Sequence, residues 1–119
     1  MARENTVLSL NPDGQTLHNH EVALRENGFD VIVVSTPLQA RFEIEMGRCG
    51  IFVSSYITPL PIYRSLADLF RRNCPDGLVI FVAHQAADGL PEADVLFFAH
   101  DEPQAIVCWI ISKQAKKAG

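Results

Sequence analysis

Five short apolar runs, spread along the whole chain, constrain the fold of this sequence more than any other feature. They occupy residues 6–10, 29–34, 50–55, 78–82 and 95–98. Each run is almost continuously apolar and does not alternate with polar residues, which predicts strands that are buried on both faces. β-Branched and aromatic residues are frequent in these runs, as expected for strands.

Segments with helical signals follow four of the five runs, at residues 15–27, 37–47, 60–73 and 103–117. Gly28 offers a left-handed C-cap to the first of these helices. Thr36 offers an N-cap hydroxyl to the second, and Pro37 fits its first turn. The region 85–93 holds Gly89 and Pro91 and has a poor helical pattern, so we expect a short or irregular helix there.

Strands that alternate with helices predict an α/β fold, in which a parallel sheet is covered on both faces. With right-handed crossovers, five such strands form a three-layer α/β/α sandwich of strand order 2-1-3-4-5, the flavodoxin-like arrangement. The sequence contains no repeat, linker or low-complexity segment. We therefore expect residues 1–119 to form a single stand-alone domain with one core.

Composition and charge exclude several function classes. Asp and Glu (14) outnumber Lys and Arg (10), and no basic stripe is present, which argues against nucleic-acid binding. The apolar runs are too short to span a bilayer, and no signal peptide follows Met1. The cysteines are odd in number and have no CxxC spacing, which predicts reduced structural thiols in a cytoplasmic protein. They are Cys49, Cys74 and Cys108.

In a sheet of this kind, ligands and chemistry lie beyond the carboxyl ends of the strands, chiefly where the strand order reverses between strands one and three. This rule selects polar and small residues after four of the strands. They are Asn11, Pro12 and Asp13, then Ser54, Ser55 and Tyr56, then Ala83 and His84, and finally Ala99, His100 and Asp101.

The whole chain resembles the receiver domain of two-component response regulators. The resemblance runs through "TVLSLNPDG", "ENGFDVIVVSTPLQA", "GIFVSSYITPLP", "PDGLVIFVAH" and "DVLFFAHDEPQAI". It implies the same CheY-like fold. In the family, an acidic pair after strand one binds magnesium, and an aspartate ending strand three accepts the phosphoryl group. A Thr or Ser ends strand four, and a lysine ends strand five.

Carried over residue by residue, every chemical position of the family falls on a residue of another type. The acidic pair falls on Asn11 and Pro12, the acceptor on Ser55, the hydroxyl on Ala83 or His84, and the lysine on Phe98 or Ala99. Asp13 is the nearest carboxylate, one or two positions late. The resemblance therefore implies the fold and argues against phosphorylation. We expect Ser54 and Ser55 to satisfy their hydroxyls locally.

We expect a degenerate receiver-like signalling domain that acts by protein contact, without enzymatic activity, metal or cofactor. The alternative is a flavodoxin-like protein that binds a small molecule or a metal at the same edge. His84 and His100, with Asp101, are a candidate transition-metal set. The turn 11–16 is faintly similar to the phosphate-binding turn of flavodoxins. His18 and His20 lie two residues apart, so they do not share a helix face and form no chelate.

The last predicted helix suggests where a partner binds. We expect Ile106, Val107, Ile110 and Ile111 to cover the sheet, which leaves Cys108 and Trp109 outside this stripe. Receiver domains often pair through the face made by helix four, strand five and helix five. The resemblance therefore implies a homodimer or a docking site centred on Trp109. The alternative is that Trp109 lies along the helix flank and packs on a neighbouring loop.

Overall fold

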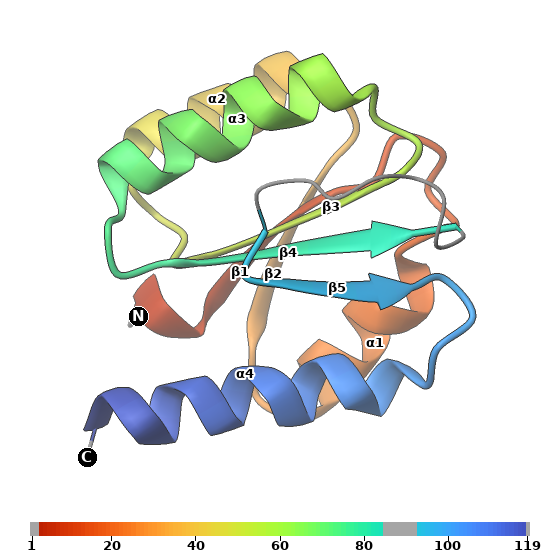
Figure 1. The fold of residues 1–119 in the computed structure, drawn as a ribbon, viewed down its shortest axis with the longest axis vertical. Helices are drawn as coiled ribbons and strands as arrows, with labels where there is room; N and C mark the ends of the chain where they lie inside the picture. The colour runs from red at the N-terminus through yellow and green to blue at the C-terminus, as the bar shows by residue number, and fades with distance from the viewer. Residues whose placement is uncertain (1–2, 85–92, 119) are drawn as a thin grey trace.

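A five-stranded parallel sheet forms the centre of the molecule (Figure 1). The computed structural model describes residues 3–84 and 93–118. The strand order is β2-β1-β3-β4-β5, as the sequence predicts. The strands are β1 (Thr6–Leu10), β2 (Asp30–Val34), β3 (Ile51–Ser55), β4 (Leu78–Ala83) and β5 (Val95–Phe98). The expected helix over 85–93 falls almost entirely outside the described residues.

Helices cover both faces of the sheet and complete the three layers. They are α1 (His18–Glu26), α2 (Pro37–Met46), α3 (Leu60–Asn73) and α4 (Pro103–Ala118), and a short 3₁₀ turn, η1 (Arg3–Asn5), precedes β1. Figure 1 shows α2 and α3 side by side on one face and α1 and α4 on the other. Within the described ranges, no helix is long and apolar enough to cross a membrane.

Local signals set the helix ends. The Thr36 hydroxyl accepts a hydrogen bond from the Gln39 backbone amide, and the Gln39 side-chain oxygen accepts one from the Thr36 backbone amide. The predicted N-cap of α2 is therefore present, in the form of a capping box. Gly28 follows α1 with a φ of 91°, a left-handed conformation that glycine adopts without strain. α1 begins at His18, three residues later than predicted, because residues 13–16 form a separate turn.

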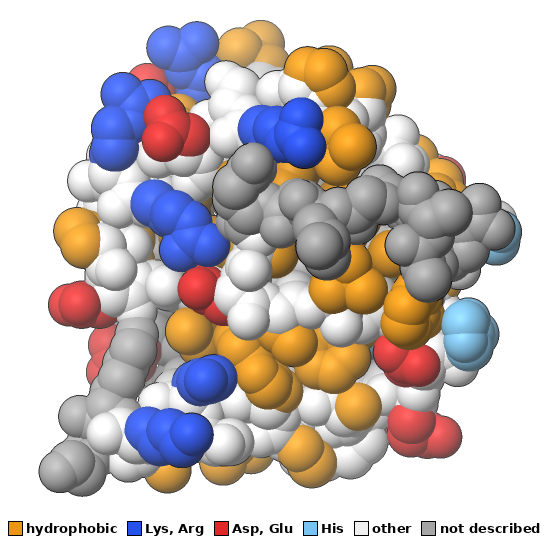
Figure 2. Space-filling model, viewed as in Figure 1, with side chains coloured by type: hydrophobic (Ala, Val, Ile, Leu, Met, Phe, Trp, Pro, Cys, Tyr) orange, Lys and Arg blue, Asp and Glu red, His pale blue; other side chains and the backbone are white. Residues whose placement is uncertain are grey.

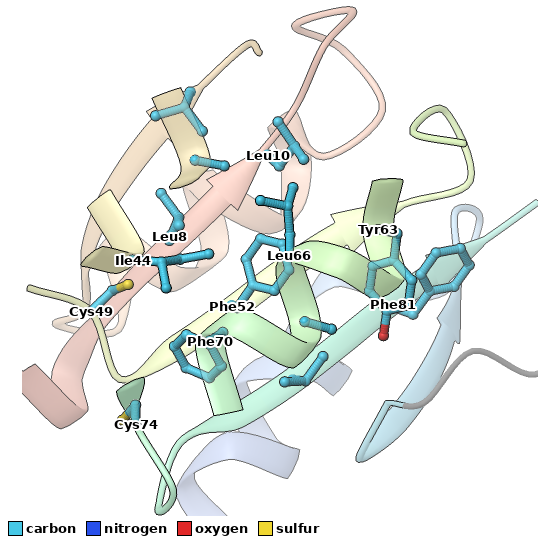
Figure 3. Packing of buried hydrophobic residues seen from close by; sticks show 14 of the residues in the cluster. Leu8, Leu10, Ile44, Cys49, Phe52, Tyr63, Leu66, Phe70, Cys74 and Phe81 are labelled. Carbon is cyan, nitrogen blue, oxygen red and sulfur yellow. The ribbon is translucent and has the colours of Figure 1, made fainter. Parts of the chain in front are cut away.

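Two apolar cores lie on opposite faces of the sheet, because successive strand residues point to opposite sides. The core beneath α2 and α3 holds several aromatic rings among its aliphatic side chains and is called the aromatic core below; the rings are those of Phe52, Tyr63, Phe70 and Phe81 (Figure 3). In this core, the Tyr63 ring lies 4.9 Å from the Phe81 ring and 6.4 Å from the Phe52 ring, centroid to centroid. The core beneath α1 and α4 is mainly aliphatic and includes Leu17 and Ile110.

The orientation of α4 differs from the sequence prediction. Ile106, Val107 and Ile110 are buried as expected, but Ile111 is 49% exposed. Trp109 is half-buried and packs against the aliphatic core. The helix is thus rotated about its axis, so that the side bearing Trp109 turns toward the sheet and the side bearing Ile111 turns away. Apolar residues on both flanks made the two orientations hard to distinguish from periodicity.

Candidate functional site

The carboxyl ends of β1 and β3 lie next to each other at the point where the strand order reverses. The chain leaves β1 toward α1 on one face and leaves β3 toward α3 on the other, which opens the edge between them (Figure 1). This is the position where doubly wound sheets place their ligands. Asn11 directly follows β1 and Ser55 ends β3, so these two predicted residues lie at this edge.

Ser55 ends β3 and is fully buried. Its hydroxyl oxygen accepts the Ile57 amide at 3.3 Å, and its carbonyl oxygen accepts the Thr58 amide at 3.1 Å. The local satisfaction predicted for the Ser55 hydroxyl is confirmed. The same prediction for Ser54 is wrong, because its buried hydroxyl has no hydrogen-bond partner among the described residues. Ser54 alternates with Ser55, so its side chain faces the aromatic core instead of the turn.

Asp13 is exposed, and its carboxylate binds to its own turn. One oxygen accepts the amides of Gln15 and Thr16 at 3.2 and 3.1 Å, and the other accepts the Thr16 hydroxyl at 2.5 Å. These hydrogen bonds, chiefly the one from the Thr16 hydroxyl, lower the pKa of Asp13. A flavodoxin-like phosphate site would need these same amides, so the carboxylate competes with that use of the turn.

A buried carboxylate beneath the edge was missed at the sequence level. Glu21 of α1 accepts the Ser9 hydroxyl at 2.6 Å and the Asn11 side-chain amide at 3.2 Å. All three side chains are buried. The burial of Glu21 could have been predicted from the sequence, because Glu21 lies four residues after Leu17 and three before Leu24, on the stripe that α1 buries.

His20 lies on the same stripe and is also buried, whereas His18 is exposed. The two histidines therefore lie on different faces, as predicted. Both ring nitrogens of His20 lack a hydrogen-bond partner within the described ranges. Burial lowers the pKa of His20, and the nearby Asp101 carboxylate partly offsets this effect.

The ends of β4 and β5 hold the other predicted residues. Ala83 is buried, and its carbonyl oxygen accepts the Ala99 amide at 2.8 Å. The Phe98 amide donates to the Asp101 carboxylate at 2.7 Å, which fixes the turn into α4. Each of these side chains or backbone groups therefore has a structural role in closing the strand ends. Figure 2 shows histidine and acidic side chains at this edge, on the right of the view.

The two histidines at this edge contact different aromatic rings. The ring centroid of His84 lies 5.1 Å from that of Tyr56, and the centroid of His100 lies 5.7 Å from that of Phe98. Among residues 3–84 and 93–118, no group of three or more His, Cys, Asp or Glu side chains is arranged to hold a metal ion. The proposed set of His84, His100 and Asp101 is therefore not assembled in this part of the chain.

The hollow beside the end of β3 is small. It measures about 180 Å³ and is lined in part by Tyr56, Thr58 and Pro59. Sites for small molecules and cofactors usually measure about 300–1,000 Å³. Larger hollows, of about 450 and 680 Å³, lie at the opposite, amino-terminal edge of the sheet, on either side of Arg3.

No protein-family profile matches the sequence, and no curated protein matches it either. Solved structures match it closely in shape. A response regulator receiver protein from Sinorhizobium medicae WSM419 is 19% identical, with a TM-score of 0.75 over 91% of this chain and 92% of the other. A CheY-like receiver domain protein from Methanospirillum hungatei JF-1 is 18% identical, with a TM-score of 0.77 over 96% and 98%.

The chain has the receiver-domain fold. The chemotaxis response regulator CheY4 of Vibrio cholerae shares this fold as well, with 12% identity and a TM-score of 0.73 over 91% of this chain and 97% of the other. At these identities the likeness establishes the three-dimensional fold, and the chemistry of the edge has to be judged from the side chains described above.

Proposed function

We propose that this protein is a degenerate receiver-like signalling domain, which acts by contact with another protein and without phosphorylation of an aspartate. One observation carries the proposal. Ser55 occupies the position that corresponds to the phosphoryl-accepting aspartate of receiver domains. Its hydroxyl is buried and accepts a hydrogen bond from the Ile57 amide. The similarity of the fold to receiver domains supports the signalling role.

The carboxylates near this edge support the same conclusion. An aspartyl phosphate needs a carboxylate nucleophile and a divalent cation, and magnesium usually requires at least one carboxylate ligand. Asp13 accepts hydrogen bonds from its own turn, and Glu21 is buried and bound to Ser9 and Asn11. Asp13 thus stabilises its own turn, and Glu21 stabilises two buried side chains beneath the edge. We therefore assign the domain no enzymatic activity.

We propose that the partner docks on the face formed by β5 and α4, in the cytoplasm. Cys108 is exposed on α4, and its neighbour Trp109 is half-buried and packs against the aliphatic core. The Lys113 ammonium lies 5.6 Å from the centroid of the Trp109 ring. Tryptophan is enriched in interface hot spots, and the cation over its ring adds a polar contact point at the edge of this face.

Phosphorylation is the sharpest test of the proposal. The protein is incubated with acetyl phosphate and magnesium and then analysed by intact mass and peptide mapping, with a phosphorylatable receiver domain as positive control. We expect no added phosphate. Phosphate on any residue of the β1–β3 edge, or a magnesium-dependent response to beryllofluoride, would overturn the proposal.

The docking face is tested by substitution. Trp109→Glu should remain folded by far-UV circular dichroism and lose capture of the partner from cytoplasmic extract. Val22→Glu, which alters an exposed apolar residue on α1, is the matched control and should retain capture. If Trp109→Glu unfolds, Cys108→Glu alters the exposed neighbour of Trp109 on α4 without touching the core. Retained capture in both α4 variants contradicts this assignment.

A further inference from the structure

Helix α2 is apolar on two opposite sides. Ala40 and Ile44 are buried against the sheet. Leu38, Phe42 and Met46 are 76%, 55% and 55% exposed, although they are large apolar side chains. A helix that covers one face of a sheet needs only one apolar stripe, so the outer stripe has no role in the core of this domain.

The outer stripe forms a continuous ridge. Its three residues are spaced by four, and at about 100° per residue Phe42 points directly away from the midpoint between Ala40 and Ile44. Ridges with this spacing are the ones that interlock when two helices pack across each other. Figure 2 shows hydrophobic side chains gathered over the α2–α3 layer at the top of the view. The ridge therefore has the form of a helix-packing surface.

A groove lies beside one end of this ridge. It measures about 400 Å³ and is lined by residues of α2 and α3, among them Leu38, Pro61 and Ile62. Met46 projects from the other end of the ridge, two turns farther along α2. If α2 of a second copy packs antiparallel on this ridge, Met46 of the second copy lies at the groove of the first. By symmetry, Met46 of the first copy lies at the groove of the second. A twofold axis next to Phe42, at the level of Glu43, thus satisfies both ends at once.

The charges along the ridge fit the same antiparallel arrangement. Arg41 and Glu45 lie on one flank of the ridge, 3.4 Å apart, and their side chains are 62% and 51% exposed. In an antiparallel pair of helices, this flank faces the same flank of the other copy in reverse order. Arg41 of each copy then lies opposite Glu45 of the other, so the surface is complementary to itself.

We propose that this chain forms a homodimer in which the α2 ridge of one copy packs antiparallel on the α2 ridge of the other, with Phe42 beside the twofold axis. The dimer does not depend on the proposed function. Phosphorylation of the β1–β3 edge would overturn the proposed function and leave the dimer standing.

Sedimentation velocity over a wide concentration range tests the dimer. We expect reversible association in the unmodified chain and a dissociation constant at least about tenfold higher in Phe42→Glu. Phe42 is exposed, so the variant should fold. Val22→Glu and Trp109→Glu are the controls and should associate normally. A chain that stays monomeric throughout, or a dimer lost in Trp109→Glu but kept in Phe42→Glu, overturns the proposal.

A charge exchange tests the antiparallel register. Arg41→Glu and Glu45→Arg, made singly, place like charges opposite each other and should each weaken the dimer about threefold. The double exchange restores opposite charges and should restore the affinity. In addition, Phe42→Cys in a Cys108→Ser background should form a disulfide-linked dimer on mild oxidation, whereas Val22→Cys should not. Failure of both the charge rescue and the crosslink overturns the register and with it the proposal.

Discussion

The Ser9 hydroxyl donates a 2.6 Å hydrogen bond to the buried Glu21 carboxylate and so joins β1 to α1 beneath the edge of the sheet. The Asn11 side chain donates to the same oxygen at 3.2 Å. A buried carboxylate with two donors stabilises a fold, but the donors become costly if the carboxylate is removed, because they stay buried without a partner.

Replacing Glu21 by Leu should therefore destabilise the protein by about 1–3 kcal/mol. Urea unfolding followed by circular dichroism measures the change. Glu26→Leu alters an exposed glutamate on the same helix and should shift stability by no more than about 0.5 kcal/mol. Equal effects of the two substitutions would mean that the Glu21 hydrogen bonds contribute nothing to stability.

The fold was predictable from the sequence, whereas the network around Glu21 was not. Short, continuous apolar runs such as 78–82 that alternate with helices indicate a covered parallel sheet, and for five strands with right-handed crossovers the flavodoxin-like strand order is the natural choice. A helical stripe shows that Glu21 and His20 face inward, but it does not show what they meet there. Ser9 lies twelve residues away from Glu21 in the chain, and only the packing of α1 on β1 brings them together.

The predictions of the α4 orientation and of the Ser54 hydrogen bond were wrong for related reasons. Trp109 and Ile111 are both apolar and flank the same buried stripe, so their spacing fits either rotation of the helix. Ser54 and Ser55 are adjacent and chemically identical, yet strand alternation sends one into the aromatic core and the other toward the turn. In both cases the deciding contact is made with a distant element of the chain.

Restoring carboxylates at the edge should require more than one substitution. Ser55→Asp alone buries a single carboxylate, which binds magnesium weakly without further anionic ligands, and it should show no magnesium binding by calorimetry. Adding Asn11→Asp and Pro12→Asp should produce measurable magnesium affinity. Absence of binding in the triple variant would mean that the edge does not have the geometry of a receiver site.

Asn11→Asp on its own should be destabilising at neutral pH. The substitution replaces a donor to Glu21 by a second carboxylate next to it, and two buried like charges repel each other. We expect a loss of about 1–3 kcal/mol at pH 7 that becomes smaller as acid neutralises the introduced carboxylate. Asp13→Asn, on the exposed turn, is the comparison. A loss that does not change with pH would point to steric disruption instead.

The three cysteines should differ sharply in reactivity. Cys108 is exposed, whereas Cys49 and Cys74 are buried. Burial is the main reason why the pKa of Cys49 rises to about 12, which leaves almost no thiolate at neutral pH. An aromatic disulfide reagent should therefore label one thiol rapidly in the native protein and three after unfolding. Cys108→Ser should abolish the rapid phase, and rapid labelling of Cys49 would contradict its burial.

His20 should make the fold sensitive to mild acid. Its pKa is lowered in the folded protein, whereas in the unfolded chain the imidazole has its ordinary pKa of about 6.5. Below pH 6.5 the unfolded state therefore binds a proton that the folded state does not, so the free energy of unfolding falls as the pH decreases. Above pH 6.5 the residue contributes no pH dependence.

His20→Leu removes the titrating group, together with two buried nitrogens that lack partners in the described part of the chain. The variant should lose less stability than the unmodified protein between pH 7.5 and 5.5. The exposed His18→Leu should retain the original dependence. Thermal unfolding at both pH values measures the difference, and an unchanged pH dependence in His20→Leu would show that His20 is protonated in the folded state as readily as in the unfolded one.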